Sequence, residues 1–405
     1  MPRFKKRGGS VEYWIEAIRA ASDIGRDTAY LMSDIWKRLI DDVEKRLNSI
    51  IPLGGVYMLD LTGDTVASKS YQEGKNKYFY GIDSSRTKPV RVGLKFVAFI
   101  SGTSVRSSLS LNERVKPIYM KVIPRPVPDA ADLASYKLEL ETDMFNLEVE
   151  ALSSTTSHIE REGLFTHSVV VLDGPLVDPP SLLGRARKHE MLDEKAESFI
   201  KNRAYNLATL YKNGVPVIGF VKKLRGSIFL EEYIGKDAEK YTPHAGDRIL
   251  AFVIANAIVN NARNYGLCTP ERPIVVITKP VPLREDKAPD VTLYNEELEK
   301  IIGSRTKVYT SLYVPVYCKG NRKIATRIEF VSSEGSEEID AVRVASHLEA
   351  SIVPGVYWPL PVLLAHRACT IKRKEGWKLL REVMSKHAVE TLIQNVPSLL
   401  ELFVD

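Results

Sequence analysis

The chain has 405 residues, of which 44% are hydrophobic and 27% charged, a composition typical of a globular protein with a large core. No apolar run approaches the roughly 20 residues of a membrane-spanning helix, and the basic start of the chain lacks the apolar stretch of a signal peptide. We therefore expect a soluble, cytoplasmic protein. The net charge of +6 slightly favours a polyanionic partner, because neutralising phosphates releases counterions.

Three cysteines, Cys268, Cys318 and Cys369, are too far apart in the sequence to form a paired zinc-binding motif. They predict buried thiols in a reducing compartment rather than a disulfide framework. The chain has only two glutamines, Gln72 and Gln394, against 57 Lys and Arg and 51 Asp and Glu. Such a bias towards ion-pairing residues is typical of proteins from thermophiles.

The first part of the chain has helical periodicity, with apolar residues repeating from Leu31 and Ile35 onwards. We predict an N-terminal helical extension over residues 1–52 and one larger domain over residues 53–405. Residues 56–77 mix short apolar pieces with Gly, Ser and Lys, and are predicted to form a hairpin or an insertion.

The core of the larger domain is predicted to span about residues 78–372. In chain order, we expect strands at 78–83, 90–92, 95–100, 168–173, 215–221, 274–277, 308–317 and 324–330, and helices at 139–157, 192–212, 247–265, 339–351 and 374–395. A turn at 84–89 and a polar, proline-rich stretch at 117–128 interrupt the first strands. A meander followed by alternating helices and strands predicts an α/β fold, a mixed sheet flanked by helices. That order, with an acidic residue on the first strand, is how ribonuclease-H-like folds are built.

Two aspartates each end a predicted strand: Asp83 ends strand 78–83, and Asp173 ends strand 168–173. A strand inside a sheet cannot hold an unpaired charge, but its end can present one at the sheet's edge. If the two strands are neighbours, two carboxylates distant in sequence meet at one point, which is how a protein collects a divalent cation for phosphodiester chemistry. Each aspartate could instead serve a turn, because small, turn-forming residues follow it.

A third carboxylate is expected from the helix at 139–157. Glu141 and Glu148 share one face of it with apolar side chains, whereas Glu150 points elsewhere. A glutamate in an apolar stripe either lies at its edge or faces a positive charge. Glu148 is therefore a candidate metal ligand, and the choice among the three glutamates stays open.

Lys222 and Lys223 follow the predicted strand 215–221, so one of them could meet a phosphate or a developing negative charge. Alternation along the strand places them on opposite faces, and only one can face the site. His366 precedes Arg367; a lone histidine there is more often structural, but its occurrence with the two aspartates favours a role in the site. Carboxylates suit Mg²⁺ or Mn²⁺, and an added imidazole favours Mn²⁺.

Four motifs occur in an order that resembles the NurA nuclease family. They are Tyr80-Gly-Ile-Asp83-Ser-Ser, Val171-Leu-Asp173-Gly-Pro-Leu176, Gly214-Val-Pro-Val-Ile-Gly-Phe-Val-Lys222-Lys223 and Trp358-Pro-Leu-Pro-Val-Leu-Leu-Ala-His366-Arg367. The resemblance implies a ribonuclease-H-like core related to Argonaute and PIWI proteins, a homodimer, and Mn²⁺-dependent cleavage of DNA. It implies a single-strand endonuclease and 5′ to 3′ exonuclease in the resection of DNA double-strand breaks, with DNA and a HerA-type hexameric helicase as partners.

The resemblance also assigns roles to individual residues. Asp83, Asp173 and Glu148 become metal ligands, and His366 becomes a ligand or a proton-transfer group. The family has a tyrosine eight residues before that histidine, where this chain has Trp358. Either the neighbouring Tyr357 serves as the catalytic tyrosine, or an aromatic ring acts there by stacking. The candidate DNA contacts are Lys222, Lys223, Trp358 and Arg367.

Two other classes of protein are compatible with parts of this pattern. A sugar-kinase-like or actin-like phosphotransferase also begins with a strand and an aspartate, but it needs glycine-rich phosphate loops. The Gly-Gly pairs here are Gly8-Gly9 and Gly54-Gly55, both outside the predicted core. The second alternative is a non-catalytic nucleic-acid-binding subunit on a ribonuclease-H-like frame, because a fold does not fix a function.

Overall fold

The computed structural model describes much of the chain between Val56 and Ile371. The described residues are 56–59, 61, 64–87, 89–92, 95–109, 114–127, 133–177, 190–222, 224, 227–235, 246–248, 250–252, 254–255, 274–284, 289–316, 326–353 and 358–371. The predicted N-terminal extension, the predicted C-terminal helix and most of the helix predicted at 247–265 lie outside them. The predicted domain boundaries therefore stay a prediction.

The described residues fall into two compact units: those within 225–260 belong to one, and those within 56–224 and 261–405 belong to the other. In the smaller unit, the short helix α6 (Ile228–Ile234) is capped by a buried carboxylate. Asp247 Oδ1 accepts hydrogen bonds from the backbone N–H groups of Phe229 and Leu230, at 3.0 Å each. These bonds satisfy donors that a first helical turn leaves free.

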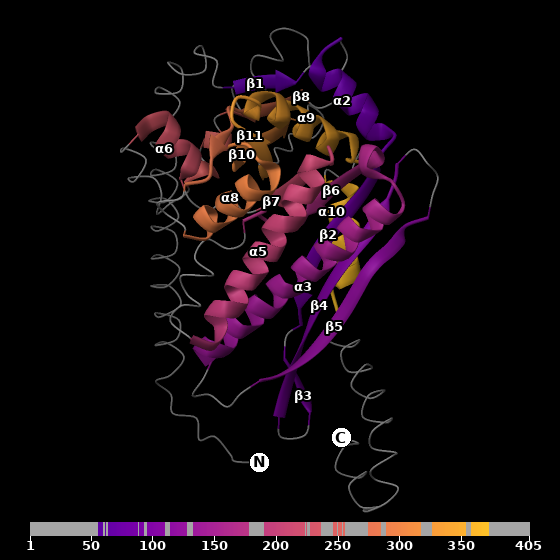
Figure 1. The fold of residues 1–405 in the computed structure, drawn as a ribbon, viewed down its shortest axis with the longest axis vertical. Coiled ribbons are helices and arrows are strands. Elements are labelled where there is room, and N and C mark those ends of the chain that lie inside the picture. Colours follow the sequence, from indigo (N-terminus) through magenta and orange to yellow (C-terminus); the bar gives the residue numbers. More distant parts are fainter. Residues whose placement is uncertain are drawn as a thin grey trace, which may run out of the picture. The chain divides into compact units, whose positions relative to one another are not determined.

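The larger unit is built on one mixed sheet, in which the described strands number 11 (Figure 1). Their order along the sheet is β1 (Val56–Leu59), β8 (Ile274–Thr278), β10 (Thr306–Val316), β11 (Thr326–Ser333), β7 (Val217–Val221), β6 (Ser168–Leu172), β2 (Tyr78–Arg86), β4 (Lys95–Ser107) and β3 (Val90–Val92). Beside this path, β5 (Lys116–Val127) pairs with β4, and β9 (Val281–Pro282) pairs with β10. The predicted α/β class with a mixed sheet is confirmed.

Strand direction changes within the sheet. The central strands β2, β6 and β7 run parallel to one another. Strand β4 pairs antiparallel with β2, β11 pairs antiparallel with β7, and β5 pairs antiparallel with β4. Strand β6 has five residues, Ser-Val-Val-Val-Leu, and all five are buried. A continuous apolar run is what a parallel strand covered on both faces requires.

Helices cover the two faces of the sheet (Figure 1). On one face, α3 (Leu133–Arg161) packs on β2, β4 and β5, and beside α5 (Glu190–Lys212), which contacts α8 (Pro289–Ile302). On the other face, α10 (Leu360–Cys369) packs on β2 and β4, and α9 (Glu337–Ala350) packs on β11 and the strands beside it. Helix α2 (Val66–Lys75) packs against α9. A short 3₁₀ helix (Phe165–His167) leads from α3 into β6. Within the described residues, no helix is both long and apolar enough to cross a membrane.

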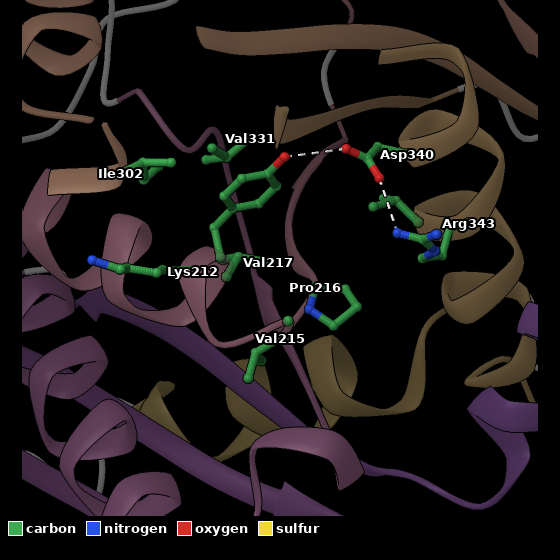
Figure 2. Close-up of a pocket in the computed structure, with 11 residues that line it drawn as sticks. Lys212, Val215, Pro216, Val217, Ile302, Val331, Asp340 and Arg343 are labelled. Carbon is green, nitrogen blue, oxygen red and sulfur yellow. Dashed lines mark hydrogen bonds and ion pairs between the residues drawn. The ribbon is translucent and has the colours of Figure 1, made fainter. Parts of the chain in front are cut away.

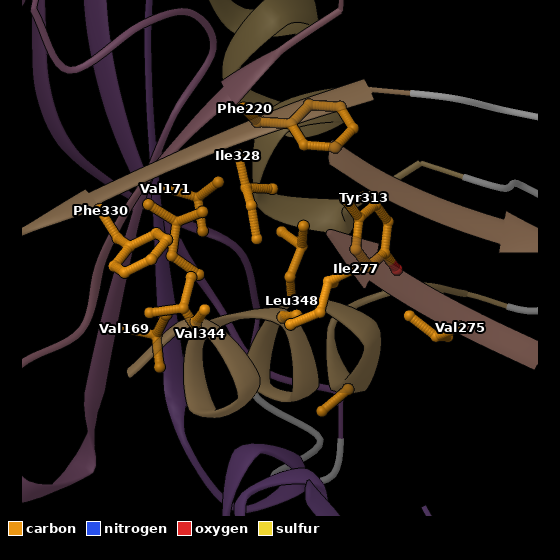
Figure 3. Close-up of a cluster of buried hydrophobic side chains, with 14 of the residues drawn as sticks. Val169, Val171, Phe220, Val275, Ile277, Tyr313, Ile328, Phe330, Val344 and Leu348 are labelled. Atoms are coloured by element: carbon orange, nitrogen blue, oxygen red, sulfur yellow. The ribbon is translucent and has the colours of Figure 1, made fainter. Parts of the chain in front are cut away.

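The main hydrophobic core lies between the central strands and α9 (Figure 3). Branched and aromatic side chains from β6, β7, β8, β10 and β11 meet apolar residues of that helix. The labelled members are Val169, Val171, Phe220, Val275, Ile277, Tyr313, Ile328, Phe330, Val344 and Leu348. A smaller cluster under α3 joins Ile100 of β4 to Leu140 and Leu147. These two cores fix α9 and α3 against opposite faces of the sheet.

The structure differs from the sequence prediction in the first strands. Strand β2 does not end at Asp83 but continues to Arg86, because residues 83–86 pair with residues 100–103 of β4. The predicted turn at 84–89 is therefore wrong in its first half. The proline-rich stretch expected to be irregular forms β5, which among the described strands pairs with β4 alone. Prolines are tolerated in an edge strand because one side of it makes no ladder.

The predicted hairpin or insertion at 56–77 is also corrected. It contains β1 and the helix α2, whose first turn is capped by Thr65, with Oγ1 accepting from the N–H of Ser68 at 3.1 Å. Helices α8 and α10 were not predicted. Helix α10 carries Pro361 in its first turn, a position where proline fits a helix because no N–H partner is lost.

Candidate metal centre

The centre lies where the parallel ladder between β2 and β6 ends. The last paired residues are Ile82 and Leu172, and the next residues are Asp83 and Asp173. The backbone N–H of Asp173 donates to the carbonyl oxygen of Ile82 at 2.8 Å. Strand β2 continues along β4, whereas β6 ends at Leu172. The two carboxylates therefore lie together at the point where β6 ends, and both side chains are 7% exposed.

Helix α10 brings His366 and Cys369 to Asp83. A Cβ at Gly81 would lie 2.0 Å from a backbone carbonyl oxygen in the first turn of α10, so glycine is required for this close approach. Asp83 follows two residues later and faces the same helix. Its Oδ2 lies 2.9 Å from Nδ1 of His366, which is 3.6 Å from Oδ2 of Asp173. The Cys369 thiol donates to the same Asp83 oxygen at 3.1 Å.

The charge on Asp83 is unfavourable in this position. Burial, and after it the negative charges of Asp173 and Glu148, raise the pKa of Asp83 to about 8, although the Cys369 thiol and Lys222 act in the opposite direction. Burial and the neighbouring carboxylates also raise the pKa of the Cys369 thiol. A cation placed among these groups would reverse the effect, because it stabilises the deprotonated forms.

Helix α3 brings Glu148 to the other face of β2. The preceding residue, Leu147, packs over Gly102 of β4, where an added Cβ would lie 2.6 Å from that of Leu147. Ser84, which follows the buried aspartate in β2, donates its hydroxyl hydrogen to Glu148 Oε1 at 2.6 Å. Arg203 Nη1 lies 3.1 Å from Glu148 Oε2. Both oxygens of this carboxylate therefore have protein partners.

The geometry distinguishes the three glutamates of the predicted helix. Glu150 faces β5, where its carboxylate accepts from the Tyr119 hydroxyl at 2.6 Å and the Lys121 ammonium at 2.8 Å. Glu141 lies seven residues before Glu148, which is about 10 Å along a helix. Glu148, by contrast, is hydrogen-bonded to Ser84 of the strand that carries Asp83.

Arg203 of α5 is a fully buried guanidinium beside the centre, with 1% of its side chain exposed. Besides its ion pair with Glu148, it donates from Nη2 to the carbonyl oxygen of Pro175 at 2.7 Å. Its guanidinium also lies 5.0 Å from the ring centroid of Phe145. Arg203 therefore links the helical glutamate to the turn that follows Asp173.

Lys222, at the end of β7, reaches the same carboxylates. Its Nζ lies 2.5 Å from Asp173 Oδ2 and 5.0 Å from the ring centroid of Trp358. Trp358 is half-buried and packs edge-on against Phe220 at 5.7 Å between centroids. Arg367 is exposed on α10, next to His366. The other two predicted site residues, Lys223 and Tyr357, lie outside the described residues.

Sequence reasoning missed three residues of this centre. Cys369 follows His366 by three residues, and i, i+3 spacing would have placed both on one helix face had α10 been predicted. Ser84 is adjacent to Asp83 but was assigned to a turn. Arg203 gave no signal, because its contacts depend on how α5 packs against α3.

The donor set can be tested for its fit to a divalent cation. Within the described residues, Lys222 pairs with Asp173 and Arg203 with Glu148, while Asp83 has His366 as its ionic partner. Asp83 thus has no permanent positive charge paired with it in this part of the chain. Asp83, His366 and Cys369 each offer a ligand atom within 4.8 Å of the others, so they could hold a metal ion. The residues present fit a cation, and the mixed oxygen, nitrogen and sulfur donors leave its identity open.

A scan against protein-family models found no match to this chain, and a search of curated proteins found none. The function must therefore be argued from the centre itself.

Proposed function

We propose that this protein is a metal-dependent nuclease that hydrolyses phosphodiester bonds of DNA and resembles the NurA family. The observation that carries the proposal is the meeting of four groups from separate elements: Asp83 of β2, Asp173 after β6, Lys222 after β7 and His366 of α10. Glu148 of α3 is bonded to the adjacent Ser84 on the other face of β2, and its charge acts on Asp83. Three carboxylates beside a lysine and a histidine are a set suited to phosphoryl chemistry.

The strand order supports a ribonuclease-H-like frame for this proposal. Strands β5, β4 and β2 form an antiparallel meander, and β6 and β7 follow β2 in parallel. The resemblance requires an aspartate, a glutamate and a second aspartate in this order along the chain. Here they are Asp83 on β2, Glu148 on α3 and Asp173 after β6. The frame is an analogy, and the function rests on the residues of the centre.

Each residue has a role that its surroundings suggest. Asp83 and Asp173 would hold a Mn²⁺ or Mg²⁺ ion with oxygen ligands, and Glu148 and His366 would complete the site. The bound ion would supply an activated water and charge stabilisation for the leaving oxygen. Lys222 is placed to exchange its partner Asp173 for a substrate phosphate. His366, whose side chain is 55% exposed, can pass a proton between the site and solvent.

The substrate and partners are part of the same proposal. Trp358 and Arg367 lie beside the centre, and an aromatic ring with an exposed arginine suits a single nucleic-acid strand. We propose single-strand endonuclease and 5′ to 3′ exonuclease activity, exerted by a homodimer with a HerA-type helicase during resection of DNA ends.

The test is cleavage of end-labelled single-stranded DNA by the full chain. We expect cleavage with Mn²⁺, none with EDTA, and none by the Asp173→Asn protein, which should keep its circular dichroism spectrum. The labelled end that disappears first gives the polarity. Wild-type turnover by the variant would remove the assignment of Asp173 and, with it, the proposed centre.

One observation favours a second function, that of a non-catalytic DNA-binding subunit. Asp173 and Glu148 already have cationic partners in the protein, Lys222 and Arg203, so two of the three carboxylates are neutralised without a metal. Metal-independent binding of single-stranded DNA, with no cleavage by the wild type in Mn²⁺ with or without a helicase partner, would establish this alternative.

A further inference from the structure

Cys369 is a sulfur donor in a centre otherwise made of oxygen and nitrogen donors. It lies on α10 three residues after His366, and its side chain is buried. Its Sγ and the His366 Nδ1 approach the same oxygen of Asp83, at 3.1 Å and 2.9 Å. The three donor atoms lie within 4.8 Å of one another.

We propose that Asp83, His366 and Cys369 bind a thiophilic divalent cation, Zn²⁺ or Cd²⁺, and that this ion blocks the centre for catalysis. The inhibitory part rests on the proposed function, because the ion would take Asp83 and His366 away from an oxygen-bound Mn²⁺ or Mg²⁺. On binding, the metal–sulfur bond replaces the S–H bond of Cys369, and the released proton goes to solvent.

The geometry needs little change to accept such an ion. With Zn–S of about 2.3 Å and Zn–N and Zn–O of about 2.0–2.1 Å, tetrahedral donors lie about 3.3 Å (N to O) and about 3.6 Å (S to O) apart. The observed separations of 2.9 Å and 3.1 Å are those of hydrogen-bonded pairs. Each pair therefore has to open by a few tenths of an ångström. Asp173 Oδ2 lies 3.6 Å from the His366 nitrogen but is paired with Lys222, so a water molecule would supply the fourth donor.

Donor chemistry decides which ion gains from the sulfur. Thiolate and imidazole ligands suit Zn²⁺, whereas Mg²⁺ and Mn²⁺ prefer carboxylates and water. Zn²⁺ also binds more tightly than Mn²⁺ to most sites of this kind. The exposed side chain of His366 gives an ion a route from solvent to the buried thiol.

The decisive measurement detects the metal–sulfur bond directly, without any nuclease assay. Cys268→Ser and Cys318→Ser together leave Cys369 as the sole thiol of the full chain. Titration of this protein with Co²⁺ or Cd²⁺ should produce the near-ultraviolet thiolate-to-metal charge-transfer band, saturating at one ion per chain. Zn²⁺ should abolish the Co²⁺ band by competition.

Cys369→Ser in the same background is the matched variant. It should lose the band and weaken Zn²⁺ binding by about tenfold or more, while Mn²⁺ binding changes by less than about twofold. Zn²⁺ should also inhibit cleavage in Mn²⁺ by the sole-thiol protein at lower concentration than by this variant, each compared with its own uninhibited rate.

Two results would overturn the inference: no band in the sole-thiol protein, or equal Zn²⁺ affinity with and without the thiol. Either would make Cys369 a structural hydrogen-bond donor to Asp83. The first result needs no change at Cys369, so a folding defect of the Cys369→Ser protein cannot hide it. A band in a protein that cleaves no DNA would support the cation site and reject the nuclease, so the two proposals fail separately.

Discussion

Two buried aspartates, Asp83 and Asp340, differ in the charges and hydrogen-bond donors that surround them. Asp340, 9% exposed, borders a pocket of about 380 Å³ between the end of α5, the start of β7 and α9 (Figure 2). Its carboxylate accepts from Ser332 at 2.7 Å, from Arg343 at 3.1 Å and from Tyr211 at 3.4 Å. Asp83 is also buried but has instead a histidine, a thiol and two further carboxylates around it.

This contrast separates buried charges that stabilise the fold from buried charges that serve a function. A buried charge that has its full set of donors and a cation is satisfied by the fold, and removing it costs stability. A buried carboxyl group surrounded by like charges destabilises the folded protein when it ionises. Proteins retain such groups for what they bind or for the chemistry they perform. On this ground we propose a functional role for Asp83 and a structural one for Asp340.

The largest expected effect is that of Asp83→Asn. The amide keeps the shape of the side chain but cannot ionise to a carboxylate ligand, so we expect DNA cleavage to fall by at least about 10³-fold. The melting temperature should stay about the same at neutral pH, where Asp83 with its pKa of about 8 is mostly protonated, and should rise relative to the wild type above pH 8, where the native carboxylate would be charged. Rates in Mn²⁺ and thermal unfolding by circular dichroism check both parts. A protein that melts lower and still cleaves would reverse our reading of Asp83.

Gly81→Ala should change the centre indirectly, by displacing helix α10. The new Cβ would lie 2.0 Å from a backbone carbonyl oxygen of α10, so this helix must move away from β2 and take His366 and Cys369 with it. We expect a loss of about 1–3 kcal/mol in the free energy of unfolding from overpacking and about 10²-fold in cleavage rate from misplaced groups. Ser85→Ala in the same strand serves as the control. Unchanged cleavage by the glycine variant would show that α10 is dispensable for the chemistry.

Arg203→Met tests the buried ion pair with Glu148. The guanidinium is 1% exposed, and its removal leaves the carboxylate without its cation. We expect a loss of about 3 kcal/mol in the free energy of unfolding. Adding Glu148→Gln should recover part of this loss, because the uncompensated charge is then gone. Chemical denaturation of the single and double variants measures the coupling; strictly additive effects would contradict a direct pair.

The pKa of Asp83, raised to about 8, predicts how the centre responds to pH. Because the folded-state pKa lies above the unfolded value near 4, this group favours folding most at low pH, and its contribution is lost as pH rises through about 8. A bound cation competes with the proton, so apparent Mn²⁺ affinity should rise with pH by about tenfold per unit below 8 and level off above it. Calorimetric titration of the wild type and of Asp83→Asn checks this slope. A flat profile in the wild type would mean that Asp83 is ionised throughout.

Much of this organisation follows from local sequence, and the rest depends on packing. Short apolar runs ending on Asp83 and Asp173 predicted two carboxylates at strand ends, and the structure places their strands side by side. The extension of β2 past Asp83 depends on its partner β4, which lies elsewhere in the sequence. The prolines of β5 are acceptable because this strand lies at an edge of the described sheet, and no local sequence pattern predicts that position. Arg203 is the extreme case, since a polar residue on a helix predicts exposure, and it is buried here by α3 and the turn after Asp173.

Asp340→Asn is expected to have the smallest effect on stability and no effect on cleavage. The amide can still accept from Ser332 and Tyr211 but loses the ionic part of its bond to Arg343, whose side chain is 48% exposed. Solvent screens such a pair, so we expect a loss of about 1 kcal/mol in the free energy of unfolding. Cleavage should stay at the wild-type rate, because Asp340 lies beyond the start of β7 and Lys222 lies beyond its end. Denaturant titration and the DNA assay, run beside Asp83→Asn, should therefore give opposite patterns. A cleavage defect in Asp340→Asn without loss of stability would show that the polar network beside the pocket is coupled to the centre.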